Sequence, residues 1–108
     1  MANTFKLKTK ANVGVTTTAV YVAPSSTTTV VIGITASNIS GNNINVGIGI
    51  TRASADDIHL MKNVPIPQGS SFEFMQGNKI VLETTDTITA KSDVANSLDV
   101  ALTIMEIT

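Results

Sequence analysis

The stretch that decides the fold is residues 28–52, which read TTVVIGITASNISGNNINVGIGITR. Its second half alternates branched aliphatic residues with small or polar ones, the signature of a strand with one buried face. The residues predicted to be buried there are Ile44, Val46, Ile48 and Ile50. In the first half, the same alternation predicts one shared face for Val30, Ile32 and Ile34.

The segment between these two halves, residues 38–43, is rich in Asn, Ser and Gly, which favour turns. We therefore expect a long antiparallel hairpin that supplies a central layer of the core. The outer side of its second strand carries Gly47 and Gly49. Glycine inside a strand weakens it and often marks a close approach by another backbone, so we expect something to lie near this bare side.

The remainder of the chain shows further short alternating segments, separated by turn-forming residues. Residues 71–75 and 79–83 flank Gln76-Gly77-Asn78 and predict a tight hairpin. Residues 53–57 are too few for an independent helix and are expected to form a loop. The other expected strands are residues 5–10, 18–23, 58–64, 87–91 and 98–107.

This pattern predicts an all-β protein, an antiparallel β-sandwich of about eight or nine short strands without substantial helix. Both a jelly-roll-like and an immunoglobulin-like topology fit, since strand order cannot be derived from the pattern. The 108 residues suit a single domain spanning residues 1–108. Residues 1–10 are expected to form either its first strand or an amino-terminal arm.

The composition excludes several classes of function. There is no cysteine, which removes disulfides and thiolate metal sites from the 108 residues. Charged residues make up 14% and the net charge is −1, whereas nucleic-acid binding depends on neutralising phosphates with basic side chains. The sequence shows neither a secretory signal nor an apolar run of about 18 residues. We expect no nucleic-acid partner, no membrane partner, and synthesis in a cytoplasm.

Residues with catalytic or metal-binding chemistry are few and scattered. His59 is the only histidine, and with Asp56 and Asp57 it forms an incomplete zinc-ligand set. We interpret it as a solvent-facing strand histidine. Gly47-Ile48-Gly49 matches half of a dinucleotide fingerprint, but Arg52 takes the third glycine position and no helix follows. The sequence therefore predicts no catalytic residue, no cofactor and no metal, and the protein is not expected to be an enzyme.

The amino-terminal segment has one apolar and one basic side. Phe5 and Leu7 alternate with Lys6, Lys8 and Lys10. One interpretation is a charged edge strand that deters aggregation, a common feature of natural sheets. The other is a docking arm that adds to the sheet edge of a neighbouring molecule and faces acidic groups there.

The last expected strand becomes apolar on both sides at its end. Met105 and Ile107 fall on the face opposite Leu102 and Ile104, which suggests burial of both faces. Together with a hydrophobic content of 43%, this predicts a homo-oligomer, such as a closed trimer, to which the chain ends contribute. The candidate partner-contact residues are Phe5, Lys6, Leu7, Lys8, Lys10, Met105 and Ile107.

Several segments together resemble small virion structural proteins of tailed bacteriophages, cyanophages among them. The segments that carry the resemblance are residues 63–71 (NVPIPQGSS), 79–83 (KIVLE), 86–88 (DTI), 97–100 (SLDV), 28–34 and 11–14. The resemblance implies a β-sandwich module assembled in many copies on a phage particle, and it implies no catalytic residue.

On that resemblance, we expect a non-enzymatic virion component, most simply a capsid decoration or accessory protein. Its partners would be other virion proteins, such as the major capsid or tail protein. A component of the tail, neck or baseplate is the nearest alternative. A module that binds a carbohydrate or a host receptor is an alternative from a different class.

Overall fold

The computed structural model describes residues 3–52, 55–74 and 79–108. These residues form strands joined by turns, and none of them lies in a helix, so the predicted all-β fold class is confirmed. It follows that no described helix is long and apolar enough to cross a membrane. The strands are β1 (Asn3–Val13), β2 (Thr18–Val22), β3 (Thr28–Asn38), β4 (Ile44–Thr51), β5 (Ile58–Ile66), β6 (Ser71–Phe74), β7 (Ile80–Leu82), β8 (Thr87–Ser92) and β9 (Leu98–Ile107).

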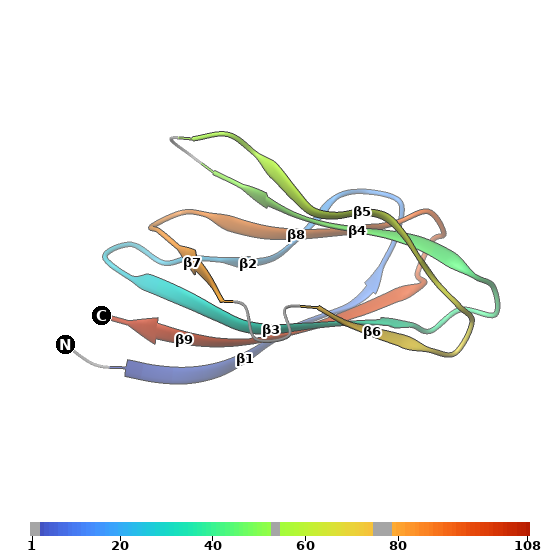
Figure 1. The fold of residues 1–108 in the computed structure, drawn as a ribbon, viewed down its shortest axis with the longest axis horizontal. Coiled ribbons are helices and arrows are strands. Elements are labelled where there is room, and N and C mark those ends of the chain that lie inside the picture. The colour runs from blue at the N-terminus through green and yellow to red at the C-terminus, as the bar shows by residue number, and fades with distance from the viewer. Residues whose placement is uncertain (1–2, 53–54, 75–78) are drawn as a thin grey trace.

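The strands form two antiparallel sheets that pack face to face (Figure 1). The five-stranded sheet has the order β1-β9-β3-β6, and β7 also pairs with β3. The four-stranded sheet has the order β2-β8-β4-β5. The first strand therefore pairs with the last, and β1 and β2 lie in different sheets. This order is that of a jelly roll, and it decides between the two topologies that the sequence leaves open.

The predicted hairpin of β3 and β4 is wrong, because these strands lie in different sheets. The segment between them crosses from one sheet to the other. Buried Asn38 holds this corner: its Nδ2 donates to the carbonyl oxygens of Asn42 (2.8 Å) and Ile66 (3.0 Å), and its Oδ1 accepts from the Ser40 amide (2.9 Å). Alternation shows which face of a strand is buried, but strands with buried faces can meet edge to edge or face to face.

Of the three β3 residues predicted to share the buried face, Val30, Ile32 and Ile34, only Ile34 is buried, so this prediction is wrong for the first half of the strand. Val31 and Ile34 are buried, whereas Val30 and Ile32 are half-buried. The pairing with β9 shifts register between Val31 and Gly33. A bulge of this kind adds one residue to a strand and moves the following side chains to the other face. The buried residues of β3 are therefore odd-numbered before Ile32 and even-numbered after it.

The interior is formed by the alternating residues of β4 and β9, as predicted. All four aliphatic residues of β4 are buried, and Leu98, Val100, Leu102 and Ile104 of β9 are 2% exposed or less. The core between the two sheets also includes Val13, Tyr21, Val31, Ile34, Met61, Ile66, Leu82 and Ile88.

The predicted hairpin of residues 71–75 and 79–83 is also wrong. Strands β6 and β7 both pair antiparallel with β3, β6 against residues 34–37 and β7 against residues 29–31. They therefore run in the same direction along one edge and do not pair with each other. The expected turn residues Gln76-Gly77-Asn78 lie outside the described residues, and of the expected loop 53–57 the described part, Ala55 to Asp57, lies in no strand.

Candidate interaction surfaces

The outer face of the five-stranded sheet carries a row of apolar side chains that crosses four strands. Phe5 of β1 pairs with Met105 of β9, Met105 pairs with Val30 of β3, and Val30 pairs with Val81 of β7. Directly paired residues share a face of the sheet, and Met105 alternates with buried Ile104. We call Phe5, Met105, Val30 and Val81 the apolar row; Phe5 is 69% exposed and Val81 58%.

The two neighbouring rows extend this apolar surface. Leu7, which is 66% exposed, pairs with Thr103, and Thr103 pairs with Gly33. On the other side, half-buried Ile107 pairs with Thr28. The sheet thus brings together the apolar contact candidates from both ends of the chain. Contiguous exposed apolar surface of this kind commonly marks an interaction site.

The three amino-terminal lysines lie on the opposite face of the same sheet. Lys6, Lys8 and Lys10 pair with Ile104, Leu102 and Val100, whose side chains point into the core. Since β1 is an edge strand, these lysines lie at the open side of the sandwich. Residues 3–10 are paired with β9 throughout, so this segment is an edge strand of the domain in the structure.

Lys6 does not present a free charge, because it forms an ion pair within the domain. Its Nζ lies 2.7 Å from Oε1 of Glu106, which is 6% exposed. The Tyr21 hydroxyl donates to Oε2 of Glu106 at 2.5 Å, and Thr29 Oγ1 lies 2.8 Å from the same hydroxyl. Because the tyrosine proton is used toward the carboxylate, the threonine is the donor in the second bond.

This network changes the acidity of both partners. The hydrogen bond from Lys6, followed by the one from Tyr21, holds the pKa of the Glu106 carboxyl below its ordinary value of 4.5. Burial, together with the hydrogen bond to Glu106, raises the pKa of Tyr21 to about 12. Glu106 is therefore a buried carboxylate that ties β1 to β9 and Tyr21.

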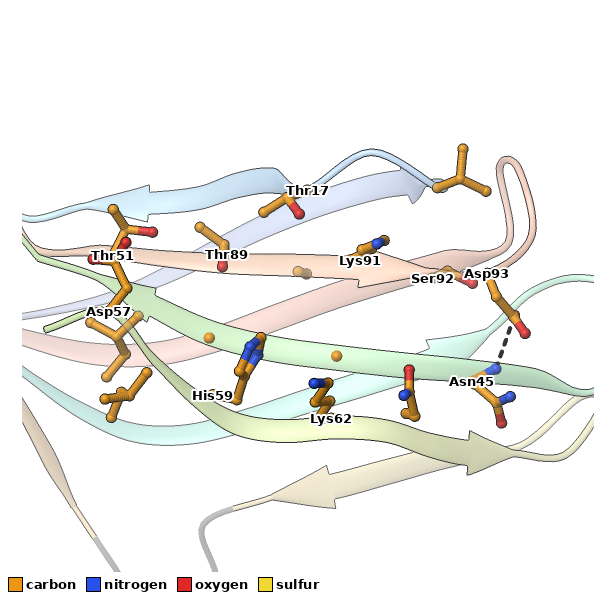
Figure 2. Close-up of a pocket in the computed structure, with 17 residues that line it drawn as sticks. Thr17, Asn45, Thr51, Asp57, His59, Lys62, Thr89, Lys91, Ser92 and Asp93 are labelled. Atoms are coloured by element: carbon orange, nitrogen blue, oxygen red, sulfur yellow. Dashed lines mark hydrogen bonds between the residues drawn. The ribbon is translucent and has the colours of Figure 1, made fainter.

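A second surface feature is a trough on the outer face of the four-stranded sheet, with a volume of about 600 Å³. Its floor is β4, where Gly47 and Gly49 have no side chain, and its walls are β8 and β5 (Figure 2). In the β-ladder Gly49 lies between Thr89 and His59, and Gly47 pairs with Lys91. The bare side that the sequence predicts for this strand is thus a hollow.

The predicted solvent-facing position of His59 is confirmed: its side chain is exposed on β5 at the wall of the trough. Within residues 3–52, 55–74 and 79–108, no three His, Cys, Asp or Glu side chains lie close enough to hold a metal ion. Asp57 is engaged, since its Oδ1 accepts from the Arg52 amide at 2.9 Å. The lining of the trough thus combines charged and hydrogen-bonding side chains with aliphatic ones.

Two features were missed in the sequence. Glu106 is in phase with the buried residues of β9, so strand alternation alone would have placed it inside. The second missed feature is the trough itself. Its two walls carry Lys62 on β5 and Lys91 on β8, which lie far apart in the chain. No pattern in the sequence predicts that β5 and β8 pair with the two opposite edges of β4.

No family model matches the sequence, and no curated protein matches it. Among solved structures, one from Bacillus endospore appendages, which are described as a novel family of disulfide-linked pili, superposes with a TM-score of 0.59. The match covers 99% of this chain and 87% of the other, at 14% sequence identity. The chain is therefore similar in fold, over nearly its whole length, to a protein of Bacillus endospore appendages.

Proposed function

We propose that this protein is a non-enzymatic structural subunit that assembles in many copies and buries the apolar row against a neighbouring molecule. The observation that carries the proposal is the row itself. Phe5, Met105, Val30 and Val81 form a continuous apolar surface across the sheet, with Phe5 and Val81 more than half exposed. Burying such surface is the main favourable term in protein association.

The likeness to a pilus protein supports a multi-copy assembly for a chain of this fold. The linkage between subunits would differ, because the 108 residues contain no cysteine and cannot form the disulfides after which those pili are described. Assembly of this protein would depend on non-covalent contacts between sheet faces and edges.

We propose that the assembly is a phage virion, in which the protein is a capsid decoration subunit that contacts other virion proteins. This rests on the resemblance of the segments around residues 63–71 and 79–83 to phage structural proteins. A tail, neck or baseplate position is the alternative on the particle. A filament is the second candidate, and the similarity to the endospore appendage favours it.

The proposal is tested by measuring the mass of the purified protein over a wide concentration range with sedimentation velocity and electron microscopy. We expect concentration-dependent assembly, which the double variant Phe5→Thr with Val81→Thr should abolish. Threonine suits exposed strand positions, so the domain should remain folded. The matched control is Val22→Thr, which changes a 51% exposed valine of the other sheet and should assemble normally.

The form of the product separates the candidates. Closed oligomers of one size favour a decoration subunit, and filaments of unlimited length favour the pilus-like role. A wild-type protein that stays monomeric at the highest concentration contradicts the proposal, as does a double variant that assembles like wild type.

A further inference from the structure

The trough over Gly47 and Gly49 has the dimensions of a ligand site. Its volume of about 600 Å³ falls within the range of about 300–1,000 Å³ that is common for such sites. It lies on the sheet opposite the apolar row, so an occupant would not compete with the assembly surface. Figure 2 shows its floor between Lys91 and Thr89 on one side and His59 and Lys62 on the other.

The two glycines of the floor are not equivalent. A Cβ at Gly49 would lie 2.8 Å from the carbonyl oxygen of Ile58, so the close approach of β5 requires glycine there. A Cβ at Gly47 would lie 3.5 Å from the carbonyl oxygen of Met61, which is an ordinary contact. Packing therefore does not explain Gly47, although glycine weakens a strand. What Gly47 provides is open space on the floor of the trough.

Basic groups surround this open space. Three of the eight basic side chains, Lys62, Lys91 and His59, line the trough. Within the part of the chain that the structure describes, neither lysine forms an ion pair. The carboxylates at the two ends are engaged with the backbone: Asp93 accepts from the Asn45 amide at 3.0 Å, and Asp57 accepts from the Arg52 amide.

The remaining polar groups of the lining are hydroxyls and amides, the rest of the lining includes aliphatic residues such as Ile58, and no Phe, Tyr or Trp is among the described lining residues. The imidazole of His59 is the one aromatic ring in that described lining, which disfavours single-stranded nucleic acid, since its successive bases stack on a series of aromatic side chains. A peptide strand on the floor of the trough is also disfavoured, because the backbone groups of β4 are used in pairing with β8 and β5 and cannot pair with an added strand. A polyhydroxylated chain with acidic groups suits the lining.

We propose that the trough binds a short segment of an acidic oligosaccharide, with a carboxylate or sulfate group above Gly47 between the ammonium groups of Lys62 and Lys91. Hydrogen bonds from ammonium groups to an anion are strong and geometrically permissive. Thr89, Thr51 and Asn63 supply partners for the sugar hydroxyls.

The probes for the test are a heparin-derived hexasaccharide, an oligogalacturonate of the same length and neutral maltohexaose, titrated by calorimetry. We expect both acidic probes to bind and the neutral one not to bind. Gly47→Glu should abolish binding, because its carboxylate takes the place of the ligand's anion between the two lysines. The matched control is Gly33→Glu on the other sheet, where a Cβ meets nothing within 4 Å; it should bind normally.

A second pair of variants keeps the test decisive if Gly47→Glu does not fold. Lys62→Gln and Lys91→Gln should each weaken the acidic probes by about tenfold or more, and Lys79→Gln, outside the trough, should change nothing. Equal binding of maltohexaose would overturn the proposal. So would tighter binding of an oligothymidylate, free sulfate binding as tightly as the hexasaccharide, or lysine variants that bind like wild type.

Discussion

The outer faces of the two sheets differ in almost every property, although their inner faces form one core. The five-stranded sheet presents apolar side chains in a row that starts at Phe5 and ends at Val81. The four-stranded sheet presents a hollow with a glycine floor and basic walls. A sandwich needs only its interior to fold, so each outer face is free to serve a separate purpose.

The largest expected effect is unfolding of the domain, which would remove the apolar row and the trough together. Ile48→Asp places a charge at a fully buried position of β4, within a core cluster of hydrophobic residues. The free energy of unfolding should fall by about 4 kcal/mol or more, measured by urea denaturation. Asn45→Asp, on the exposed side of the same strand, should lose less than about 1 kcal/mol. Similar stabilities for the two variants would contradict the assignment of the core.

The next largest effect should weaken the apolar row and leave the trough unchanged. Glu106→Gln removes the charge that pairs with Lys6 and loosens β1, which carries Phe5. We expect a loss of about 1–3 kcal/mol and weaker assembly, with binding in the trough unchanged. Glu73→Gln, an exposed change on β6, is the control and should be neutral. Equal losses in both variants would show that the Glu106 network does not hold the edge strand.

The same network predicts two limits of stability in pH. The pKa of Glu106 is lowered in the folded protein, so its contribution is present above about pH 4.5 and is lost as the pH falls through the folded value. The pKa of Tyr21 is raised from 10.0 to about 12, so its contribution is present below pH 10 and is lost as the pH rises toward 12. Thermal melts across both ranges should show these losses.

Variants of the two residues serve as controls for the pH profile. In Glu106→Gln the acid loss should shrink, and in Tyr21→Phe the alkaline loss should shrink. An acid limb that is the same in Glu106→Gln and in wild type would assign the transition to other carboxylates.

Paired glycine variants sharpen the contrast between the faces. Gly33 lies on the outer face of the five-stranded sheet, in the row that contains Leu7 and Thr103. Gly33→Glu should impair assembly and spare the binding of an acidic oligosaccharide, whereas Gly47→Glu should do the reverse. Sedimentation velocity and calorimetry on both variants check this, and loss of both activities in either one would mean that the faces are coupled.

The smallest effect is the response to salt. Raising the ionic strength from about 0.01 M to about 0.1 M shortens the screening length from about 30 Å to about 10 Å. Binding in the trough should weaken, because it depends on charge, while assembly through the apolar row should be unchanged. Assembly that dissociates with salt would instead assign the interface to the lysines of β1.

The sequence predicts faces well and neighbours poorly, and the reason is physical. The period of two in β4 and β9 placed Ile48 and Leu102 inside, because alternation is a local property. Whether β3 meets β4 edge to edge or face to face depends on the whole topology. The bulge at Ile32 moves the following side chains of β3 to the opposite face of the sheet. No residue type at this position predicts a bulge. The apolar row joins Phe5 to Met105 only through the register of β1 against β9.

The position of β9 in the five-stranded sheet has a consequence for how the protein folds during synthesis. Domains often begin to fold from the amino terminus while the ribosome is still elongating the chain. Here the last strand lies between β1 and β3, so β1 has no partner in its sheet until Ile107 has emerged. Such long-range pairing slows folding. Until then β1 and β3 expose the edges that β9 later covers, and a nascent chain in that state is open to pairing with another copy.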